Sequence, residues 1–251
     1  MNRSRATLDG KWVLITGAAK RIGACMARTL HASGANIAVH YRGSVQPATE
    51  LADELNAGRR DSALTVSADL LDTGALPGLI ERVIGESGRL DALINNASSF
   101  YPTPLGKVTE QNWDDLIGTN LKAPLFLSQA AAPHLKAAQG CIINMIDIHA
   151  TRPLRHHTVY GPAKAGLAML TRTLARDLAP EIRVNGVSPG AILWPEDGMS
   201  DGIKENILKQ IPLRRAGEPE DLADCVLYLL RDADYVTGQI IAIDGGRSIG
   251  W

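Results

Sequence analysis

Tyr160 and Lys164 are the two residues of this sequence whose types and spacing most directly suggest chemistry. They are four positions apart, so they share one face of a helix that we predict to run on through Leu167, Leu170 and Leu174. A free tyrosine has a pKa of about 10, and a nearby ammonium group favours the phenolate and lowers that pKa. The pair therefore indicates a proton-transfer site. The same spacing alone also fits a surface tyrosine and a solvated lysine. Other motifs in the chain are needed to choose between a proton-transfer site and such a surface pair.

A glycine-containing loop lies near the amino end. Residues 16–23 (TGAAKRIG) follow a predicted strand and open a predicted helix, and they include Gly17, Arg21 and Ile22. Glycines at such a turn let the backbone approach a pyrophosphate near a helix N-terminus. The loop therefore predicts a dinucleotide site, and a tight turn that merely needs glycine is the alternative.

The end of the second predicted strand bears on which dinucleotide is bound. It reads His40, Tyr41, Arg42, Gly43 and Ser44, and no acidic residue follows before Glu50. An NAD enzyme usually places an acid here against the ribose 2′-hydroxyl. Arg42 and Ser44, with Arg21, could instead bind a 2′-phosphate through charge-assisted hydrogen bonds worth about 1.5–3 kcal/mol each. We therefore expect NADP(H), unless Arg42 is an ordinary solvated arginine.

Short β-branched runs alternate with longer helical patterns, which is typical of a parallel sheet covered by helices on both faces. We predict an α/β, Rossmann-like doubly wound sheet forming a single domain over residues 1–251, with an irregular substrate lid around 192–212. The first predicted helix includes Ala24, Ala27 and residues 28–31 and stops at Ser33-Gly34. The seven predicted strands cover residues 11–16, 35–41, 62–67, 90–94, 140–146, 182–187 and 239–244.

Composition excludes several other classes of protein. The net charge is −1 and the charges are spread along the chain, so we expect no nucleic-acid partner. Cys25, Cys141 and Cys225 are far apart and lack metal-ligand spacing, which favours a reducing compartment, the cytoplasm, and no metal site. No stretch approaches the roughly 20 apolar residues that span a bilayer, so we expect no membrane association.

Taken together, the motifs resemble the short-chain dehydrogenase/reductase family from about Asp9 to Gly246. The matching features are the glycine loop, Asn95-Asn96-Ala97, Asn120, Tyr160 with Lys164, and Pro189-Gly190. The resemblance implies a Rossmann fold with strand order 3-2-1-4-5-6-7 and a homotetramer.

The resemblance also implies individual roles. Tyr160 would donate the proton, Lys164 would bind the nicotinamide ribose and depress the tyrosine pKa, and Asn120 would hold a water of a proton relay. Tyr160 and Lys164 would thus also contact the cofactor. The other implied cofactor-binding residues are Gly17, Arg21, Ile22, His40, Tyr41, Arg42, Ser44, Asp69, Leu70, Asn96, Ala97, Ser98, Pro189, Gly190, Ala191 and Ile192.

Two positions depart from the common family pattern. Arg21 stands where most members have the middle glycine of the loop, and Asp147 stands where they have a catalytic serine, thirteen residues before Tyr160. An ionised aspartate only accepts hydrogen bonds and would repel the oxyanion that develops when a ketone is reduced. A substrate reduced at a C=N bond offers ring N–H groups to a carboxylate, and its ring nitrogen must gain a proton. A reduced pterin fits that description.

Pteridine reductases within the family share both departures, and the chain also resembles them at residues 95–105 (NNASSFYPTPL) and at His40-Tyr41. By that resemblance Phe100 would stack the pterin against the nicotinamide, Ser98 and Arg21 would bind the pterin and the cofactor phosphates, and Asp147 with Tyr160 would supply the proton. Phe100 could instead be a core aromatic residue, and Asp147 a helix cap.

Other residues near these motifs are expected to lie around the site or at subunit contacts. Trp194 would border the pterin tail or anchor the lid to the core. His149, His156 and His157 are interpreted as lid or interface residues, because their spacing is not that of a metal site. The apolar carboxyl end, Ile249 and Trp251, is expected to pack on a neighbouring subunit.

Three functions remain open from the sequence. The first is reduction of a dihydropterin or a dihydrofolate-like ring by NADPH. The second is general carbonyl reduction, for example of 3-oxoacyl thioesters, which would use the same Tyr160 and Lys164. The third is a non-catalytic NADP(H)-sensing protein that has kept the fold, against which the intact Asn120, Tyr160 and Lys164 count.

Overall fold

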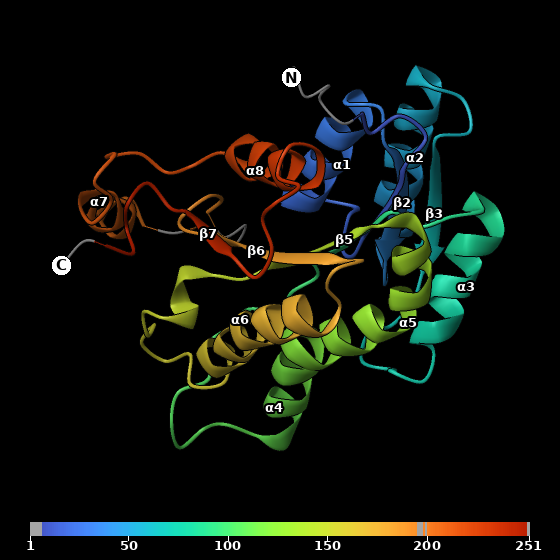
Figure 1. Ribbon diagram of the computed structural model, residues 1–251. Coiled ribbons are helices and arrows are strands. Elements are labelled where there is room, and N and C mark those ends of the chain that lie inside the picture. Colours follow the sequence, from blue (N-terminus) through green and yellow to red (C-terminus); the bar gives the residue numbers. More distant parts are fainter. Residues whose placement is uncertain (1–6, 195–197, 199, 250–251) are drawn as a thin grey trace.

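The protein is built around one seven-stranded sheet in which every neighbouring pair of strands is parallel (Figure 1). The computed structural model describes residues 7–194, 198 and 200–249. The strand order is β3-β2-β1-β4-β5-β6-β7, so the fold class and the order expected from the family resemblance are both confirmed. The strands are β1 (Trp12–Ile15), β2 (Asn36–Tyr41), β3 (Ala63–Ser67), β4 (Ala92–Asn95), β5 (Cys141–Met145), β6 (Arg183–Pro189) and β7 (Ile240–Ile243).

Helices cover both faces of this sheet. On one face α1 (Arg21–Ala32), α2 (Val45–Gly58) and α8 (Pro219–Arg231) contribute Leu30, Leu51 and Val226 to one buried cluster. On the other face α3 (Leu76–Ser87), α5 (Ala123–Ala138) and α6 (Tyr160–Asp177) enclose a second cluster. The central strands β1, β4 and β5 are buried along their whole length, which explains why they appear in the sequence as largely apolar runs.

The helix before α5 contains a widened turn. Residues 110–138 form α4 (Glu110–Ile117), a π-helical segment η1 (Gly118–Lys122) and then α5, without a break between them. A π turn holds one more residue than an α turn, and such segments often occur at functional sites. Asn120 lies in this segment and is buried.

The expected lid is only partly irregular. Between residues 192 and 212 the structure has the helix α7 (Asp201–Lys209), whose nine residues include none that is buried. The helix was not predicted, because Pro195 and Gly198 just before it indicated an irregular segment. Pro195 lies outside the described residues, as does Trp251 at the carboxyl end, whereas Ile249 is described and highly exposed.

No helix in the described part of the chain is long and apolar enough to cross a membrane.

Candidate functional site

The glycine loop closes tightly where β1 gives way to α1. Gly17 has a φ of +62°, and a Cβ there would lie 3.1 Å from the Cα of Ala97. A Cβ on Gly23 would lie 2.4 Å from the carbonyl oxygen of Gly17. Asn96 completes the turn, because its side-chain amide donates to the carbonyl oxygen of Thr16 at 2.8 Å. The two glycines are therefore required by close backbone approach, as the sequence pattern suggested.

Arg21 occupies a backbone conformation that normally favours glycine. Its φ is +54°, in the left-handed region, where an L side chain costs roughly 1–2 kcal/mol. The guanidinium donates to the carbonyl oxygen of Trp194 at 3.4 Å, so Arg21 links the cofactor loop to the start of the lid segment. The glycine-to-arginine departure thus has a backbone cost and places a cation beside the lid.

His40 is hydrogen-bonded to the glycine loop. The backbone N–H of Gly17 donates to His40 Nδ1 at 3.1 Å, and His40 Nε2 lies 3.2 Å from the carbonyl oxygen of Ala68. Burial lowers the pKa of His40 to about 4, so the ring is neutral at pH 7. Nδ1 must then be the acceptor and Nε2–H the donor to Ala68. The ring connects β2, the glycine loop and the segment after β3.

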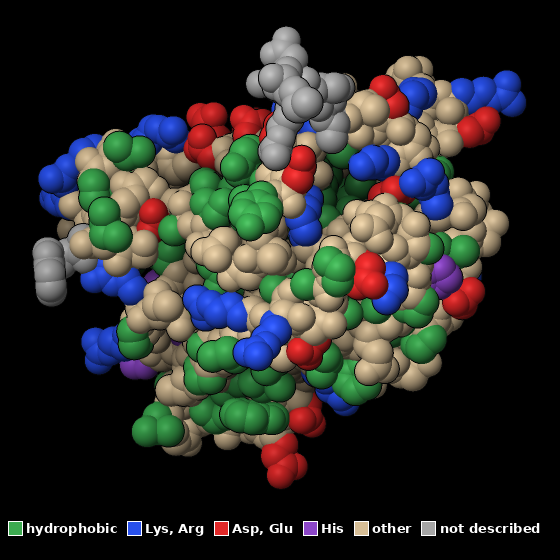
Figure 2. All heavy atoms as spheres, in the orientation of Figure 1, with side chains coloured by type: hydrophobic (Ala, Val, Ile, Leu, Met, Phe, Trp, Pro, Cys, Tyr) green, Lys and Arg blue, Asp and Glu red, His purple; other side chains and the backbone are tan. Residues whose placement is uncertain are grey.

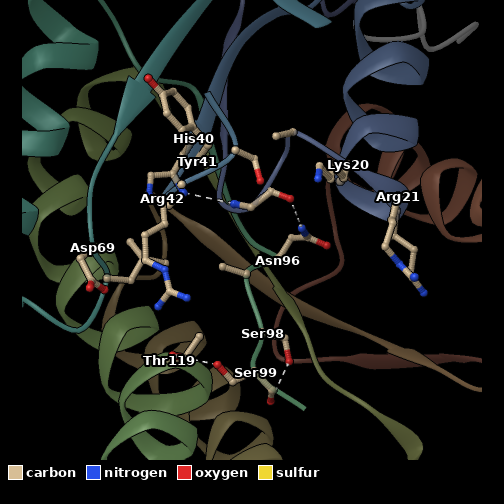
Figure 3. Close-up of a pocket in the computed structure, with 18 residues that line it drawn as sticks. Lys20, Arg21, His40, Tyr41, Arg42, Asp69, Asn96, Ser98, Ser99 and Thr119 are labelled. Carbon is tan, nitrogen blue, oxygen red and sulfur yellow. Dashed lines mark hydrogen bonds between the residues drawn. The ribbon is translucent and has the colours of Figure 1, made fainter. Parts of the chain in front are cut away.

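Above the carboxyl ends of the strands lies a cavity of about 570 Å³, which is the size range of ligand-binding pockets. Figure 3 shows Arg42 extending into it near Asp69, with Arg21 at the opposite end. Twelve of the expected residues line this cavity: Gly17, Arg21, Ile22, His40, Tyr41, Arg42, Ser44, Asp69, Leu70, Asn96, Ala97 and Ser98. Four further lining residues, Ala19, Lys20, Gly23 and Gly43, belong to the stretches 16–23 and 40–44 but were not singled out, and two, Ser99 and Thr119, were not expected.

The charges of this cavity fit a phosphorylated dinucleotide. Lys20, Arg21 and Arg42 line it together with one carboxylate, that of Asp69. Ser44 precedes α2, and its side chain makes no capping hydrogen bond there. Cations and backbone N–H groups next to a helix N-terminus are the donors that phosphate oxygens require.

Asp147 and Tyr160 are in direct contact. The Tyr160 hydroxyl donates to Asp147 Oδ2 at 2.8 Å, while Asp147 Oδ1 accepts the backbone N–H of His149 at 2.8 Å. Asp147 therefore also caps the short 3₁₀ helix η2 (Ile148–Ala150), as the alternative interpretation expected, and the cap leaves its second oxygen in contact with Tyr160. One oxygen orients the carboxylate and the other contacts the phenol.

The pKa of Tyr160 is raised, contrary to the expectation that a cation would lower it. Burial is the largest cause, followed by the negative charge of Asp147 and the hydrogen bond to it; a hydrogen bond with Ser98 acts in the opposite direction. Lys164 does not offset these effects, since its Nζ donates to the carbonyl oxygen of Met145 at 2.9 Å and lies 5.7 Å from the centre of the Tyr160 ring. In this arrangement Tyr160 stays protonated, as a proton donor must.

Lys164 is fully buried beneath Tyr160 near the start of α6. Burial lowers its pKa to about 8, and the charge of Asp147 opposes that shift. The ammonium form therefore predominates at neutral pH. The spacing of Tyr160 and Lys164 correctly predicted that they share one helix face. It could not predict that the ammonium group donates to the carbonyl oxygen of Met145 and lies 5.7 Å from the centre of the Tyr160 ring.

Asn120 and Ser98 form the next layer of the site. The Ser98 hydroxyl donates to Asn120 Oδ1 at 2.6 Å. The amide of Asn120 donates to the carbonyl oxygens of Ser99 and Leu116, both at 2.9 Å. The π segment turns Asn120 toward the loop after β4, and this loop in turn carries Ser98 to the edge of the cavity.

Phe100 is not a core residue, because 52% of its surface is exposed. Its ring lies edge-on to Tyr160 with 4.8 Å between ring centres, and it stacks on His157 at 4.7 Å with an interplanar angle of 18°. His157 Nε2 is buried and has no hydrogen-bond partner among the residues that the structure describes. From the sequence, His157 was predicted only as a lid or interface residue, because no periodicity links it to Phe100.

The other expected site residues, Phe100, Asn120, Asp147, Tyr160 and Lys164 among them, are not lining residues of this cavity. Pro189, Gly190, Ala191 and Ile192 do not line it in the described part of the chain; Gly190 instead packs against Asp244, where a Cβ would lie 2.6 Å from the Asp244 Cβ. Ile192 is buried in the core cluster that includes α8. Trp194 is half-buried and is linked to Arg21 through its carbonyl oxygen.

Known proteins match the chain over almost all of its length. A family model described as enoyl-(acyl carrier protein) reductase matches residues 17–248. Pteridine reductase 1 of Leishmania tarentolae is 38% identical over 277 aligned positions, covering 94% of this chain and 96% of the relative. The 3-oxoacyl-[acyl-carrier-protein] reductase FabG of Staphylococcus aureus is 39% identical over 240 positions, covering 94% and 97%.

A third relative is the putative ketoacyl reductase 2 of the granaticin polyketide synthase from Streptomyces violaceoruber, 35% identical over 243 positions, which cover 94% of this chain and 95% of the relative. The relatives thus include reductases named for two kinds of substrate at similar identity. The whole-length matches, the sheet order and the arrangement of Asn120, Tyr160 and Lys164 agree. The chain belongs to the short-chain dehydrogenase/reductase family of oxidoreductases.

Proposed function

We propose that this protein is an NADPH-dependent pteridine reductase that reduces a dihydropterin or a dihydrofolate-like ring. The observation that carries the proposal is the contact of Tyr160 with a carboxylate, Asp147, at 2.8 Å, beside the exposed ring of Phe100. A planar ring stacked on Phe100 would meet a proton donor and a hydrogen-bond acceptor at the same edge.

The chemistry of that edge suits a ring with nitrogens. An ionised Asp147 accepts from N–H groups, and the Tyr160 phenol, whose pKa is raised by burial and by Asp147, holds a proton for a ring nitrogen. For a ketone, the same carboxylate would face the developing oxyanion and oppose it. The bound cofactor would supply the hydride, and Lys164 would hold positive charge beneath Tyr160.

NADPH is proposed over NADH because of the lining of the cavity. Arg42 extends into it where the ribose 2′-phosphate of NADP is expected, directly after β2, and Ser44 lies two residues further on. Arg21, Ser98, Phe100 and Trp194 would then surround the pterin end.

Reduction of 3-oxoacyl thioesters is the second candidate, because the FabG relative is as similar as the pteridine reductase relative. The two proposals separate at Asp147. If the enzyme reduces pterins, Asp147→Ser lowers kcat/KM for them by about 100-fold or more, the size of loss usual for a proton-transfer group. If it reduces 3-oxoacyl thioesters, the serine preserves or improves that activity.

The test is NADPH oxidation with dihydrobiopterin, dihydromonapterin, dihydrofolate and a 3-oxoacyl thioester, repeated with NADH. No turnover of the three pteridines at high enzyme concentration would refute the pteridine proposal. Tight NADPH binding without hydride transfer to any substrate would favour the non-catalytic sensor. Fluorescence titration adds an independent measurement: pterin or methotrexate binding is expected to require bound NADPH, because the ring would stack on the nicotinamide.

The proposal includes a homotetramer of single-domain subunits, each with the segment 192–212 as a lid, working in the cytoplasm. Apolar side chains on α4 and α6 support an assembly, since Trp113 is 52% exposed and Met169 is 61% exposed. Figure 2 shows hydrophobic atoms gathered at the lower end of the molecule, over these helices. Light scattering of the purified protein gives the molar mass; a monomer would contradict this part of the proposal.

A further inference from the structure

The loop that carries Ser98 and Phe100 alternates between two environments. Ser98 and Phe100 are exposed on the site side, where Ser98 contacts Asn120 and Phe100 contacts Tyr160. The residues between and after them, Ser99 and Tyr101, are partly buried and donate their hydroxyls to Asp115. Because they are the chain neighbours of Ser98 and Phe100, holding their side chains restricts how the backbone presents Ser98 and Phe100.

One carboxylate holds both residues of the second set. Asp115, on α4, accepts the Tyr101 hydroxyl at Oδ2 at 2.9 Å and the Ser99 hydroxyl at Oδ1 at 3.2 Å. Hydrogen bonds to an ionised acceptor are stronger and more directional than those between neutral groups. Burial and the bond to Asp115 both raise the pKa of Tyr101, so its hydroxyl remains a donor. Asp115 therefore binds the loop on both sides of Phe100.

A second attachment lies just beyond. The backbone N–H of Thr103 donates to the carbonyl oxygen of His156 at 2.5 Å, and the Thr158 hydroxyl donates to the carbonyl oxygen of Thr103 at 2.6 Å. This attachment joins the loop to the segment that supplies His157, on which Phe100 stacks. It fixes the far end of the loop, whereas Asp115 fixes the stretch that presents Ser98 and Phe100.

We propose that Asp115 is a positioning residue of the reductase site. It sets the orientation of Ser98 and Phe100, because its two carboxylate oxygens accept hydrogen bonds from Ser99 and Tyr101. The expected effect of Asp115 on pterin reduction rests on the proposed function. Asp115 acts through the loop and makes none of the contacts expected with the substrate.

The first test compares Asp115→Ala with Asp114→Ala. Asp114 is the preceding residue of the same helix and is exposed, so its variant removes the same charge without touching the loop. We expect Asp115→Ala to lower kcat/KM for the dihydropterin by about tenfold or more, mainly through KM, because small misplacements of a site residue can cost up to about 100-fold. All parameters of Asp114→Ala are expected to stay unchanged.

The second test needs no substrate. The chain has two phenylalanines, Phe100 and Phe126, so labelling with 4-fluorophenylalanine gives two ¹⁹F resonances. Phe126 lies on α5 and packs against the core, which makes it an internal reference. In Asp115→Ala the Phe100 resonance is expected to shift or broaden while that of Phe126 stays in place, and neither resonance is expected to move in Asp114→Ala.

The outcomes separate this inference from the proposed function. If the wild-type enzyme turns over no pterin, the proposed function fails while the fluorine spectra still test Asp115. An unchanged Phe100 resonance, or equal changes at Phe100 and Phe126, overturns the positioning role. If Asp115→Ala fails to fold, Ser99→Ala provides the spectra and Tyr101→Phe the kinetics. Each removes one bond to Asp115 and is expected to reproduce part of the effect; no effect in either would overturn the inference.

Discussion

Protonation of His40 is expected to weaken the fold and the cofactor loop together. The ordinary pKa of the residue is 6.5, and burial holds it at about 4 in the folded protein. Between these values the unfolded chain binds a proton that the folded chain does not, so the free energy of unfolding falls as the pH falls. The contribution of His40 is complete above about pH 6.5 and is lost as the pH approaches 4.

The size of the effect follows from the two pKa values. At pH 5 the imidazole of the unfolded chain is almost fully protonated and that of the folded protein only about a tenth so, which lowers the free energy of unfolding by about 2 kcal/mol relative to pH 8. A protonated Nδ1 would also face the N–H of Gly17, which now donates to it. The affinity for NADP⁺ should therefore decline over the same range.

Urea unfolding and NADP⁺ titration at pH 8 and pH 5 measure both effects, with His40→Asn as the reference. Asparagine offers an acceptor at a similar position and does not titrate. Other groups that titrate in this range, including His31, whose pKa burial also lowers, contribute equally to both proteins and cancel in the difference. Parallel pH dependence in wild type and His40→Asn would refute the assignment of a neutral, hydrogen-bond-accepting His40.

Three further predictions concern single side chains. Arg42→Ala should raise the Kd for NADPH by about 10-fold or more, the equivalent of one charge-assisted bond, and leave the Kd for NADH nearly unchanged in calorimetric titrations; equal losses would remove Arg42 from the 2′-phosphate site. Because the pKa of Lys164 is about 8, kcat/KM should fall as the pH rises through that value, and a profile flat to pH 10 would show that its charge is dispensable. Arg21→Gly should relieve about 1 kcal/mol of left-handed strain and weaken NADPH binding. A variant with a lower melting temperature and full affinity would contradict both parts.

Most of the fold could be predicted from the sequence because parallel strands buried on both faces leave a strong signal. All seven strands begin and end within two residues of their predicted limits. α7 was missed although Ile203, Ile207 and Leu208 recur at helical spacing, because Pro195 and Gly198 just before it indicated an irregular segment.

The candidate site also has a part that could be predicted from the sequence and a part that could not. The cofactor cavity could be predicted because its residues come from contiguous loops with recognisable types, such as 16–23 and 40–44. The contacts of Asp115 and His157 could not, since they join residues from separate elements that no local pattern connects. The direction of the Tyr160 pKa was predicted wrongly for a related reason: spacing gives the proximity of Lys164 but neither the depth of burial nor the direction of its Nζ.

The π segment between α4 and α5 changes the direction in which the residues after it point, relative to the residues before it. Each residue of an α-helix turns the chain by about 100°, so one additional residue rotates everything after it by that angle relative to everything before it. Here the part before the segment presents Asp115 to the loop, and the part after it presents Leu127 to the sheet. Deleting a single residue from 118–122 would restore a regular helix and force the protein to lose either the alignment of the loop or the packing of α5. In this helix, the contact of Asp115 with the loop and the packing of α5 on the sheet are therefore linked by rotational phase.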